Sequence, residues 1–307
     1  MTGATAARAP RARDAVFDEA FLRKLAQLDI VARRLRAGLL RGERRSTKRG
    51  QSVEFADFRS YTPGDDLRRV DWNVYARFER AFIKLYQEEE DRTVHVLVDG
   101  SASMEWGEGA VHKLTYARRA AAALGYIALA GLDRVAPALV SAGLDRQGPV
   151  LRGSGALFRL LDFLGGEIPV DAQTNLDAAL AQYAARAHHP GPLFLVSDLF
   201  CPGSGKAGIA ALAARGYEVN VVHTLAPDEL DPGLTGELRL IDRETGAARE
   251  LTVDDAALAR YRQALDRWRA DLAAHCGGRG VLYLPVSTAL PFEDLILTAL
   301  RHGGMVR

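Results

Sequence analysis

Apolar residues from about residue 90 onward follow two alternating patterns. Short, nearly continuous apolar runs are typical of strands buried in a parallel sheet. They alternate with segments whose apolar residues recur every three or four positions, as in helices. The pattern predicts an α/β fold, with a doubly wound, mostly parallel sheet and helices on both faces. The predicted strands are residues 94–98, 135–140, 193–197, 217–223 and 281–286, with a hairpin at 238–241 and 248–253, and the predicted helices are 113–131, 157–164, 176–187, 209–215, 254–274 and 292–300.

The first 90 residues show a different pattern. Apolar positions with helical spacing predict a helix over residues 17–40, and two alternating stretches, 52–58 and 82–86, predict strands. Residues 62–65, Thr-Pro-Gly-Asp, predict a turn. We therefore expect three parts: a disordered tail over residues 1–15, a basic helix with a short β extension over 16–90, and an α/β domain over 91–307.

Charge is distributed unevenly along the chain. The formal net charge is +1, but residues 1–49 carry 13 Lys and Arg against five Asp and Glu, which leaves the remainder net acidic. One interpretation is a solvated basic helix that packs on an acidic body. The alternative is contact with an anionic membrane surface or with nucleic acid, although no interleaved aromatic residues support stacking on bases.

Two further features bear on the compartment. Cys201 and Cys276 lack the spacing of a zinc site or a disulfide framework, which favours a reducing environment. The longest apolar run, residues 120–132, is shorter than the roughly 20 residues that a membrane span needs. We expect a cytoplasmic protein without a transmembrane segment, and a peripheral position at the membrane stays open.

Small oxygen-bearing side chains follow the predicted strands. In an open α/β sheet, ligands bind at the carboxyl ends of the strands. Asp99, Ser101 and Ser103 follow the strand at 94–98, Asp198 follows the strand at 193–197, and Thr174 lies in a loop between two helices. Alternate residues of an extended turn point the same way, so the first three can converge on one point. Oxygen ligands without His or Cys favour Mg²⁺ or Mn²⁺ over zinc.

This arrangement resembles the metal-ion-dependent adhesion site of von Willebrand factor A domains. All five positions match: Asp-x-Ser-x-Ser after the first strand, a Thr in a later loop, and an Asp after a later strand. The resemblance implies that residues 91–307 form a von Willebrand factor A-like domain. It also implies that a carboxylate from a partner protein fills the last coordination position of the metal.

The preceding segment carries a long motif that runs from Glu54 through Tyr61, Pro63-Gly64-Asp65-Asp66, Arg68, Asp71-Trp72 and Ala76-Arg77 to Lys84 and the acidic run 88–90. This motif resembles that of a narrower bacterial family, the domain of unknown function 58 family. The resemblance covers roughly residues 17–225, and it implies an association with MoxR-type AAA+ ATPases, which are the presumed partners of family members. We interpret the Pro63-to-Arg77 stretch as structural, with its aspartates paired to its arginines.

These observations lead to a hypothesis and two alternatives. The hypothesis is a non-enzymatic, metal-dependent protein-interaction module that works with a MoxR-type AAA+ ATPase in protein assembly or remodelling. The first alternative is a metal-dependent hydrolase, for which the sequence nominates no general base. The second is an adaptor that binds a membrane surface or nucleic acid through the basic N-terminal segment.

Overall fold

The structure is a computed structural model of the 307-residue chain. It describes residues 23–28, 30, 53–62, 70, 72–78, 80–88, 92–167, 174–186, 189–242 and 246–307. The chain divides into two compact units. One comprises residues 40–91, and the other combines residues 1–39 with 92–307.

A seven-stranded sheet forms the centre of the larger unit. Its strand order is β11-β8-β7-β3-β4-β5, with β6 also paired to β4. Contacts from β11 through β4 are parallel, whereas β5 and β6 pair antiparallel with β4. The sequence therefore predicted the mostly parallel α/β sheet correctly. The strands are β3 (Thr93–Asp99), β4 (Arg134–Val140), β5 (Leu144–Gln147), β6 (Leu151–Arg152), β7 (Pro192–Ser197), β8 (Glu218–Leu225) and β11 (Leu282–Ser287).

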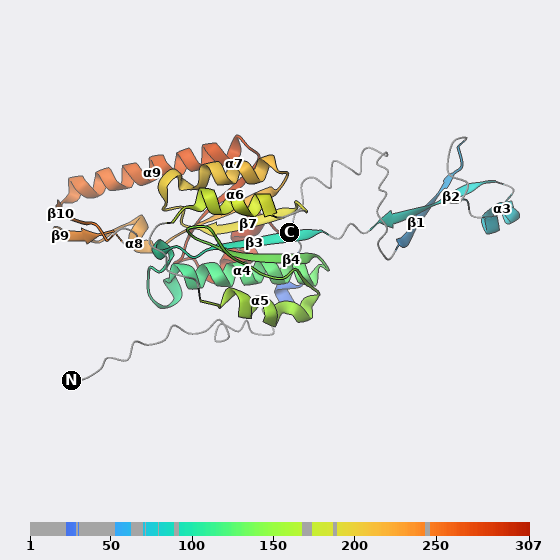
Figure 1. The fold of residues 1–307 in the computed structure, drawn as a ribbon, viewed down its shortest axis with the longest axis horizontal. Helices are drawn as coiled ribbons and strands as arrows, with labels where there is room; N and C mark the ends of the chain where they lie inside the picture. The colour runs from blue at the N-terminus through green and yellow to red at the C-terminus, as the bar shows by residue number, and fades with distance from the viewer. Residues whose placement is uncertain are drawn as a thin grey trace. The chain divides into compact units, whose positions relative to one another are not determined.

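Helices cover both faces of this sheet (Figure 1). On β3, Val94, Val96 and Val98 point into a core shared with α4 and α5, whereas Leu97 points into a second core shared with α6, α7 and α9. This alternation is that of a strand buried on both sides. The helices are α4 (Lys113–Ala130), α5 (Leu157–Leu164), α6 (Leu176–Arg186), α7 (Lys206–Ala214), α8 (Pro227–Leu230), α9 (Asp255–Gly277), α10 (Phe292–Asp294) and α11 (Leu300–His302).

Short helical turns complete the loops. A π-helical segment, Leu295–Ala299, joins α10 to α11, so the predicted helix at 292–300 is present with a widened middle. The 3-10 turns are Ala102–Met104, Gly109–Val111, Ser154–Ala156 and Pro202–Gly205. Within the described parts of the chain, no helix is long and apolar enough to cross a membrane. Both cysteines are free thiols.

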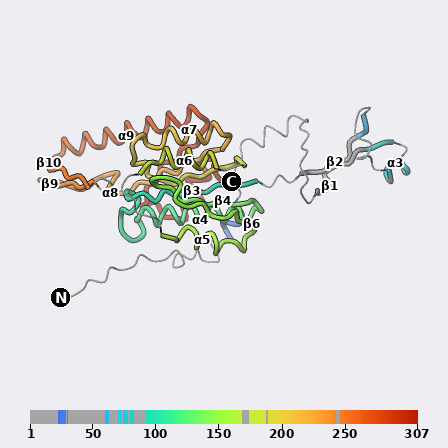
Figure 2. Tube along the Cα trace, in the orientation of Figure 1, coloured from blue at the N-terminus to red at the C-terminus, as the bar shows by residue number. Residues whose placement is uncertain are grey.

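An antiparallel hairpin precedes α9. Strands β9 (Gly236–Ile241) and β10 (Ala248–Val253) pair as the sequence predicted, and α8 lies just before them. Figure 2 shows the hairpin and the first turns of α9 at the same end of the unit as α8. Asp254 caps α9 by accepting a hydrogen bond from the backbone N–H of Ala257 at 2.6 Å.

The smaller unit contains the predicted β extension. Strands β1 (Val53–Ser60) and β2 (Phe82–Glu88) pair antiparallel, and α3 (Trp72–Phe78) lies in their connection. The predicted turn beyond Thr62 and most of the Pro63-to-Arg77 motif before α3 lie outside the described residues.

Of the predicted helix over residues 17–40, the described residues Arg23–Leu25 are helical, whereas residues 26–28 and 30 are not. After Arg23–Leu25 the chain enters a turn, and Ile30 forms an isolated antiparallel bridge with Val306. Leu25, Leu28 and Ile30 are buried in the core of the larger unit. Their spacing therefore reflects burial against that core rather than a continuous helical face. The two compact units divide at 39/40 and 91/92, and the expected boundaries are 15/16 and 90/91. The proposed tail over residues 1–15 lies outside the described residues.

Candidate metal centre

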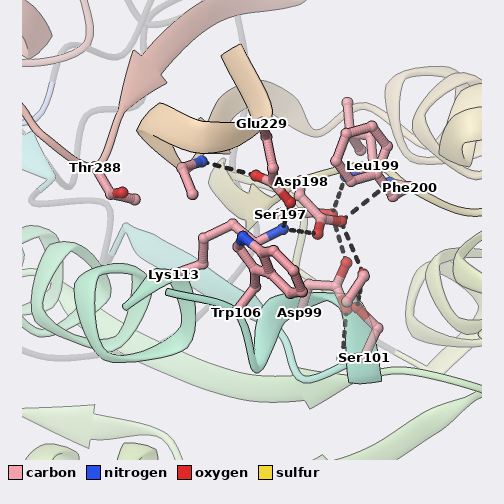
Figure 3. A network of polar contacts seen from close by, with 12 residues as sticks. Asp99, Ser101, Trp106, Lys113, Ser197, Asp198, Leu199, Phe200, Glu229 and Thr288 are labelled. Carbon is pink, nitrogen blue, oxygen red and sulfur yellow. Dashed lines mark hydrogen bonds and ion pairs between the residues drawn. The ribbon is translucent and has the colours of Figure 1, made fainter. Parts of the chain in front are cut away.

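Two loops leave the sheet where its connections change direction. After β3 the chain crosses to β4 on one side, and β7, which comes later, lies on the other side of β3. At such a switch point, the loops after the two neighbouring strands run in opposite directions. The carboxyl ends of these strands are therefore open to ligands. Asp99 is the last residue of β3, and Asp198 directly follows β7. The two aspartates therefore lie at the switch point of the sheet, and Figure 3 shows Asp99 and Ser101 beside Asp198.

Asp99 is held by hydrogen bonds to both of its carboxylate oxygens. Its Oδ1 accepts from the backbone N–H of Ser101 at 2.9 Å, and its Oδ2 accepts from the hydroxyl of Ser197. The side chain is buried, with 1% of its surface exposed. Burial, and then the charge of Asp198, raise the pKa of Asp99 to about 7. The carboxylate is thus fixed in place, and a bound cation would favour its charged form.

The two serines connect the aspartates. Ser101 Oγ lies 3.0 Å from Ser103 Oγ, and Ser103 Oγ donates to Asp198 Oδ1 at 3.2 Å. The 3-10 turn Ala102–Met104 lies at this point of the loop, and the two hydroxyls are within hydrogen-bond distance of each other. Ser103 and Asp198, which are 95 positions apart in sequence, are therefore joined in one row of oxygen atoms that begins at Ser101.

Asp198 is fully buried, and each of its carboxylate oxygens has its own partners. Oδ1 accepts from Ser103 and from the backbone N–H of Phe200 at 3.0 Å. Oδ2 accepts from the ammonium of Lys113 at 2.6 Å, and the same ammonium donates to Glu229 Oε1 at 2.6 Å. Figure 3 shows Lys113 between the two carboxylates.

Thr174 is buried near the same end of the sheet, but its side chain is not joined to the other four. The backbone N–H of its neighbour Asn175 donates to the carbonyl of Ser141 at 3.1 Å, just after β4. Gly100, in the turn after Asp99, donates to the carbonyl of Val140 at 2.8 Å. Both loops are thus anchored at the end of β4. Among the described residues, no hydrogen bond links Thr174 to the predicted site residues on β3 and β7.

The oxygen atoms of the site suit a small hard cation. Neighbouring ligands in an octahedral Mg²⁺ shell, with bonds of about 2.1 Å, lie roughly 3 Å apart. The Ser101–Ser103 and Ser103–Asp198 oxygen pairs lie 3.0 and 3.2 Å apart. In the described portion of the chain, no group of three or more His, Cys, Asp or Glu side chains could hold a metal ion. A cation at this site would therefore depend on the hydroxyls as well as on the two carboxylates.

Comparison with known families shows to which family the chain belongs. The model of the family described as "Protein of unknown function DUF58" matches residues 57–271. The chain belongs to the DUF58 family. An uncharacterized protein of Mycobacterium bovis and another of Mycobacterium tuberculosis are each 27% identical to it over 266 residues, which is 86% of this chain and 84% of theirs.

Two solved structures are similar at low sequence identity. The conserved hypothetical protein BatB from Bacteroides thetaiotaomicron is 15% identical with a TM-score of 0.44, over 69% of this chain and 98% of that one. An aerotolerance-related membrane protein from Bacteroides fragilis is 17% identical with a TM-score of 0.41, over 69% of this chain and 99% of that one.

Sequence reasoning missed three residues at this site of the DUF58 chain. Lys113 begins α4, Ser197 ends β7 and Glu229 lies in α8. A lysine at a helix start and a glutamate in a Pro-Asp-Glu-Leu segment look like solvent-exposed charges in a sequence. Ser197 had a usable signal, since it is the polar last residue of a strand that is otherwise continuously apolar.

Proposed function

We propose that this DUF58 protein is a non-enzymatic protein-interaction module that grips its partner through a divalent cation. The cation, Mg²⁺ or Mn²⁺, is held by Asp99, Ser101, Ser103, Thr174 and Asp198 in a von Willebrand factor A-like domain. The observation that carries the proposal is the line of oxygen atoms from Ser101 through Ser103 to Asp198, beside Asp99, at the switch point of the sheet.

The charge of the site supports a partner that presents an acidic side chain. Two buried carboxylates and neutral hydroxyls leave a doubly charged cation without a surplus of negative ligands, so the ion still attracts an anion. A carboxylate side chain of another protein supplies one. In the absence of the cation, the two carboxylates offer that side chain no ligand position. Partner binding is therefore expected to require the metal.

The proposed ATPase partner comes from the family resemblance. The DUF58 resemblance associates this chain with a MoxR-type AAA+ ATPase, and we propose that the ATPase performs protein assembly or remodelling while this chain recruits the client. The buried site, with its hydroxyls bonded to carboxylates, supports a fixed platform for a cation rather than a nucleophile.

Calorimetric titration of the full chain with MgCl₂ and MnCl₂ tests the metal site. Asp99→Ala and Asp198→Ala are expected to abolish binding because each removes a charged ligand, and Thr174→Val is expected to weaken it by removing a hydroxyl. Asp266→Ala, on the exposed surface of α9, is the matched control. Unchanged metal affinity in both site variants would contradict the assignment.

The role of the metal in recruitment needs a separate measurement. An affinity-tagged chain is incubated with native lysate with and without EDTA, and the captured proteins are identified by mass spectrometry. We expect a set of proteins that disappears with EDTA and in Asp198→Ala. Turnover of a phosphate ester that EDTA abolishes would instead favour the hydrolase alternative.

A further inference from the structure

Lys113 is a buried cation within the candidate centre. Its side chain has no exposed surface, although lysine is among the residues least often fully buried. Its ammonium contacts Asp198 Oδ2 and Glu229 Oε1, each at 2.6 Å, and lies 5.2 Å from the centre of the Phe200 ring. An ammonium withdrawn from water needs such charged partners to offset the cost of desolvation.

The position of Lys113 in α4 does not favour its charge. It is the first residue of the helix, where the helix dipole disfavours a positive charge. His112 caps the helix by accepting from the backbone N–H of Thr115, so capping does not require the lysine. The carboxylates of Asp198 and Glu229 are thus what holds the ammonium at this point.

Asp198 divides its two oxygens between different neighbours. Oδ1 lies with the serine hydroxyls, and Oδ2 lies with Lys113. A cation bound among the hydroxyls would share this carboxylate with the ammonium. Like charges a few ångströms apart in a buried site repel strongly.

Building on the proposed metal site, we propose that Lys113 is an internal counter-ion that competes with the divalent cation for Asp198. It thereby lowers the affinity of the site for that cation. Without a metal, the ammonium neutralises Asp198 and keeps the loops after β3 and β7 assembled. When a cation enters, Lys113 keeps Glu229 as its partner, so it does not become a buried unpaired charge.

Glu229 is held firmly enough to serve as that second partner. Its Oε2 accepts from the backbone N–H of Ala226 at 2.7 Å, and its carbonyl accepts from the hydroxyl of Tyr261. The neighbouring Asp228 accepts from the indole N–H of Trp106 at 2.9 Å. These bonds fix α8 independently of Asp198, so the Lys113–Glu229 pair can persist when Asp198 turns to a metal.

The sign of an affinity change tests this inference. We expect Lys113→Met, in the full chain, to bind Mg²⁺ and Mn²⁺ at least about tenfold more tightly by calorimetry, because it removes a competing positive charge. The double variant Lys113→Met with Glu229→Gln removes one charge of each sign. It therefore avoids a Glu229 carboxylate that has lost its ammonium partner. It is also expected to bind more tightly, and it replaces the single variant if that one does not fold.

Lys206→Met, which removes a lysine paired with Asp271 at the surface, is the matched control and should leave affinity unchanged. Weaker or unchanged binding in the folded Lys113 variants, with binding in the wild type, would overturn the competition and leave the metal site standing. Absence of binding in the wild type and in both Lys113 variants would overturn the metal site itself. Binding only in the Lys113 variants would support the competition and contradict metal loading of the natural chain.

Discussion

Ser197 joins two turns at the candidate centre through one hydroxyl. Its Oγ accepts from the backbone N–H of Leu199 at 2.9 Å and donates to Asp99 Oδ2. Leu199 has a φ of 57°, a left-handed conformation that is costly for a residue with a branched side chain. The hydroxyl therefore supports a strained turn after β7 and orients the carboxylate at the end of β3.

Replacement of Ser197 by Ala should measure this support. The variant leaves the N–H of Leu199 and one oxygen of Asp99 buried without the hydroxyl that bonds them, so we expect the free energy of unfolding to fall by about 1–3 kcal/mol. Urea denaturation followed by circular dichroism measures the change. Ser287→Ala is the matched control: Ser287 ends the edge strand β11 and accepts from the backbone N–H of Ala289 at 3.2 Å, but it is only half-buried. Equal losses in the two variants would show that the bond to Asp99 contributes nothing.

At the scale of elements, the parallel strands of the sheet were predictable because each one is marked by an apolar run in its own sequence. Strands β3 and β7 are nearly continuous apolar runs, and the polar residues that follow them mark the carboxyl edge of the sheet. Asp99, Ser101, Ser103 and Asp198 could therefore be placed near one another from sequence alone. The short strand β5, Leu-Asp-Arg-Gln, has no apolar alternation, and neither pattern reveals it.

The parts that escaped prediction depend on contacts between distant segments. Lys113 and Glu229 are 116 residues apart and meet because β8 brings α8 to the start of α4. The apolar residues near position 28 were assigned to a helix because helical spacing also arises when a turn and a bridge bury the same residues. Periodicity indicates that a residue is buried without indicating what covers it.

His95, in the middle of β3, makes the stability of the sheet depend on pH. Its ring nitrogens bond to the hydroxyl of Tyr183 at 2.7 Å and to the carbonyl of His189 at 2.9 Å. Burial lowers the pKa of His95 from 6.5 to about 4. Above pH 6.5 the imidazole is neutral in both the folded and the unfolded chain, so it adds no pH dependence. Below pH 6.5 the unfolded chain binds a proton that the folded chain does not.

The free energy of unfolding should therefore fall by about 1.4 kcal/mol per pH unit from this residue as the pH drops from 6.5 towards 4. Urea unfolding at about pH 7.5, 6.5, 5.5 and 4.5 measures the slope. We expect His95→Gln, which keeps a polar side chain, to flatten the slope by that amount, with His302→Gln at an exposed position as the control. Identical slopes for His95→Gln and the wild type would exclude this contribution.

At the scale of the whole molecule, the surplus of positive charge is concentrated in residues 23–49, which hold ten Lys and Arg against two Asp and Glu. Part of this segment belongs to the core of the larger unit. Leu25, Leu28 and Ile30 are buried there, and a guanidinium N–H of Arg92 donates to the carbonyl of Ile30 at 3.1 Å. Deletion of residues 1–49 would remove core side chains together with charge, so a loss of binding after deletion would have two causes.

Charge substitution separates the basic segment from the metal centre as the source of partner binding. We expect a variant with Arg44, Arg45, Lys48 and Arg49 replaced by Gln to capture the same EDTA-sensitive proteins from native lysate as the wild type, because recruitment depends on the cation and a partner carboxylate. Binding to anionic vesicles and to duplex DNA is measured in parallel at about 50 and 200 mM salt, between which phosphate contacts weaken steeply. The opposite conclusion would follow if the charge variant captured none of these proteins and EDTA did not change what the wild type captures. The basic segment would then be the binding surface.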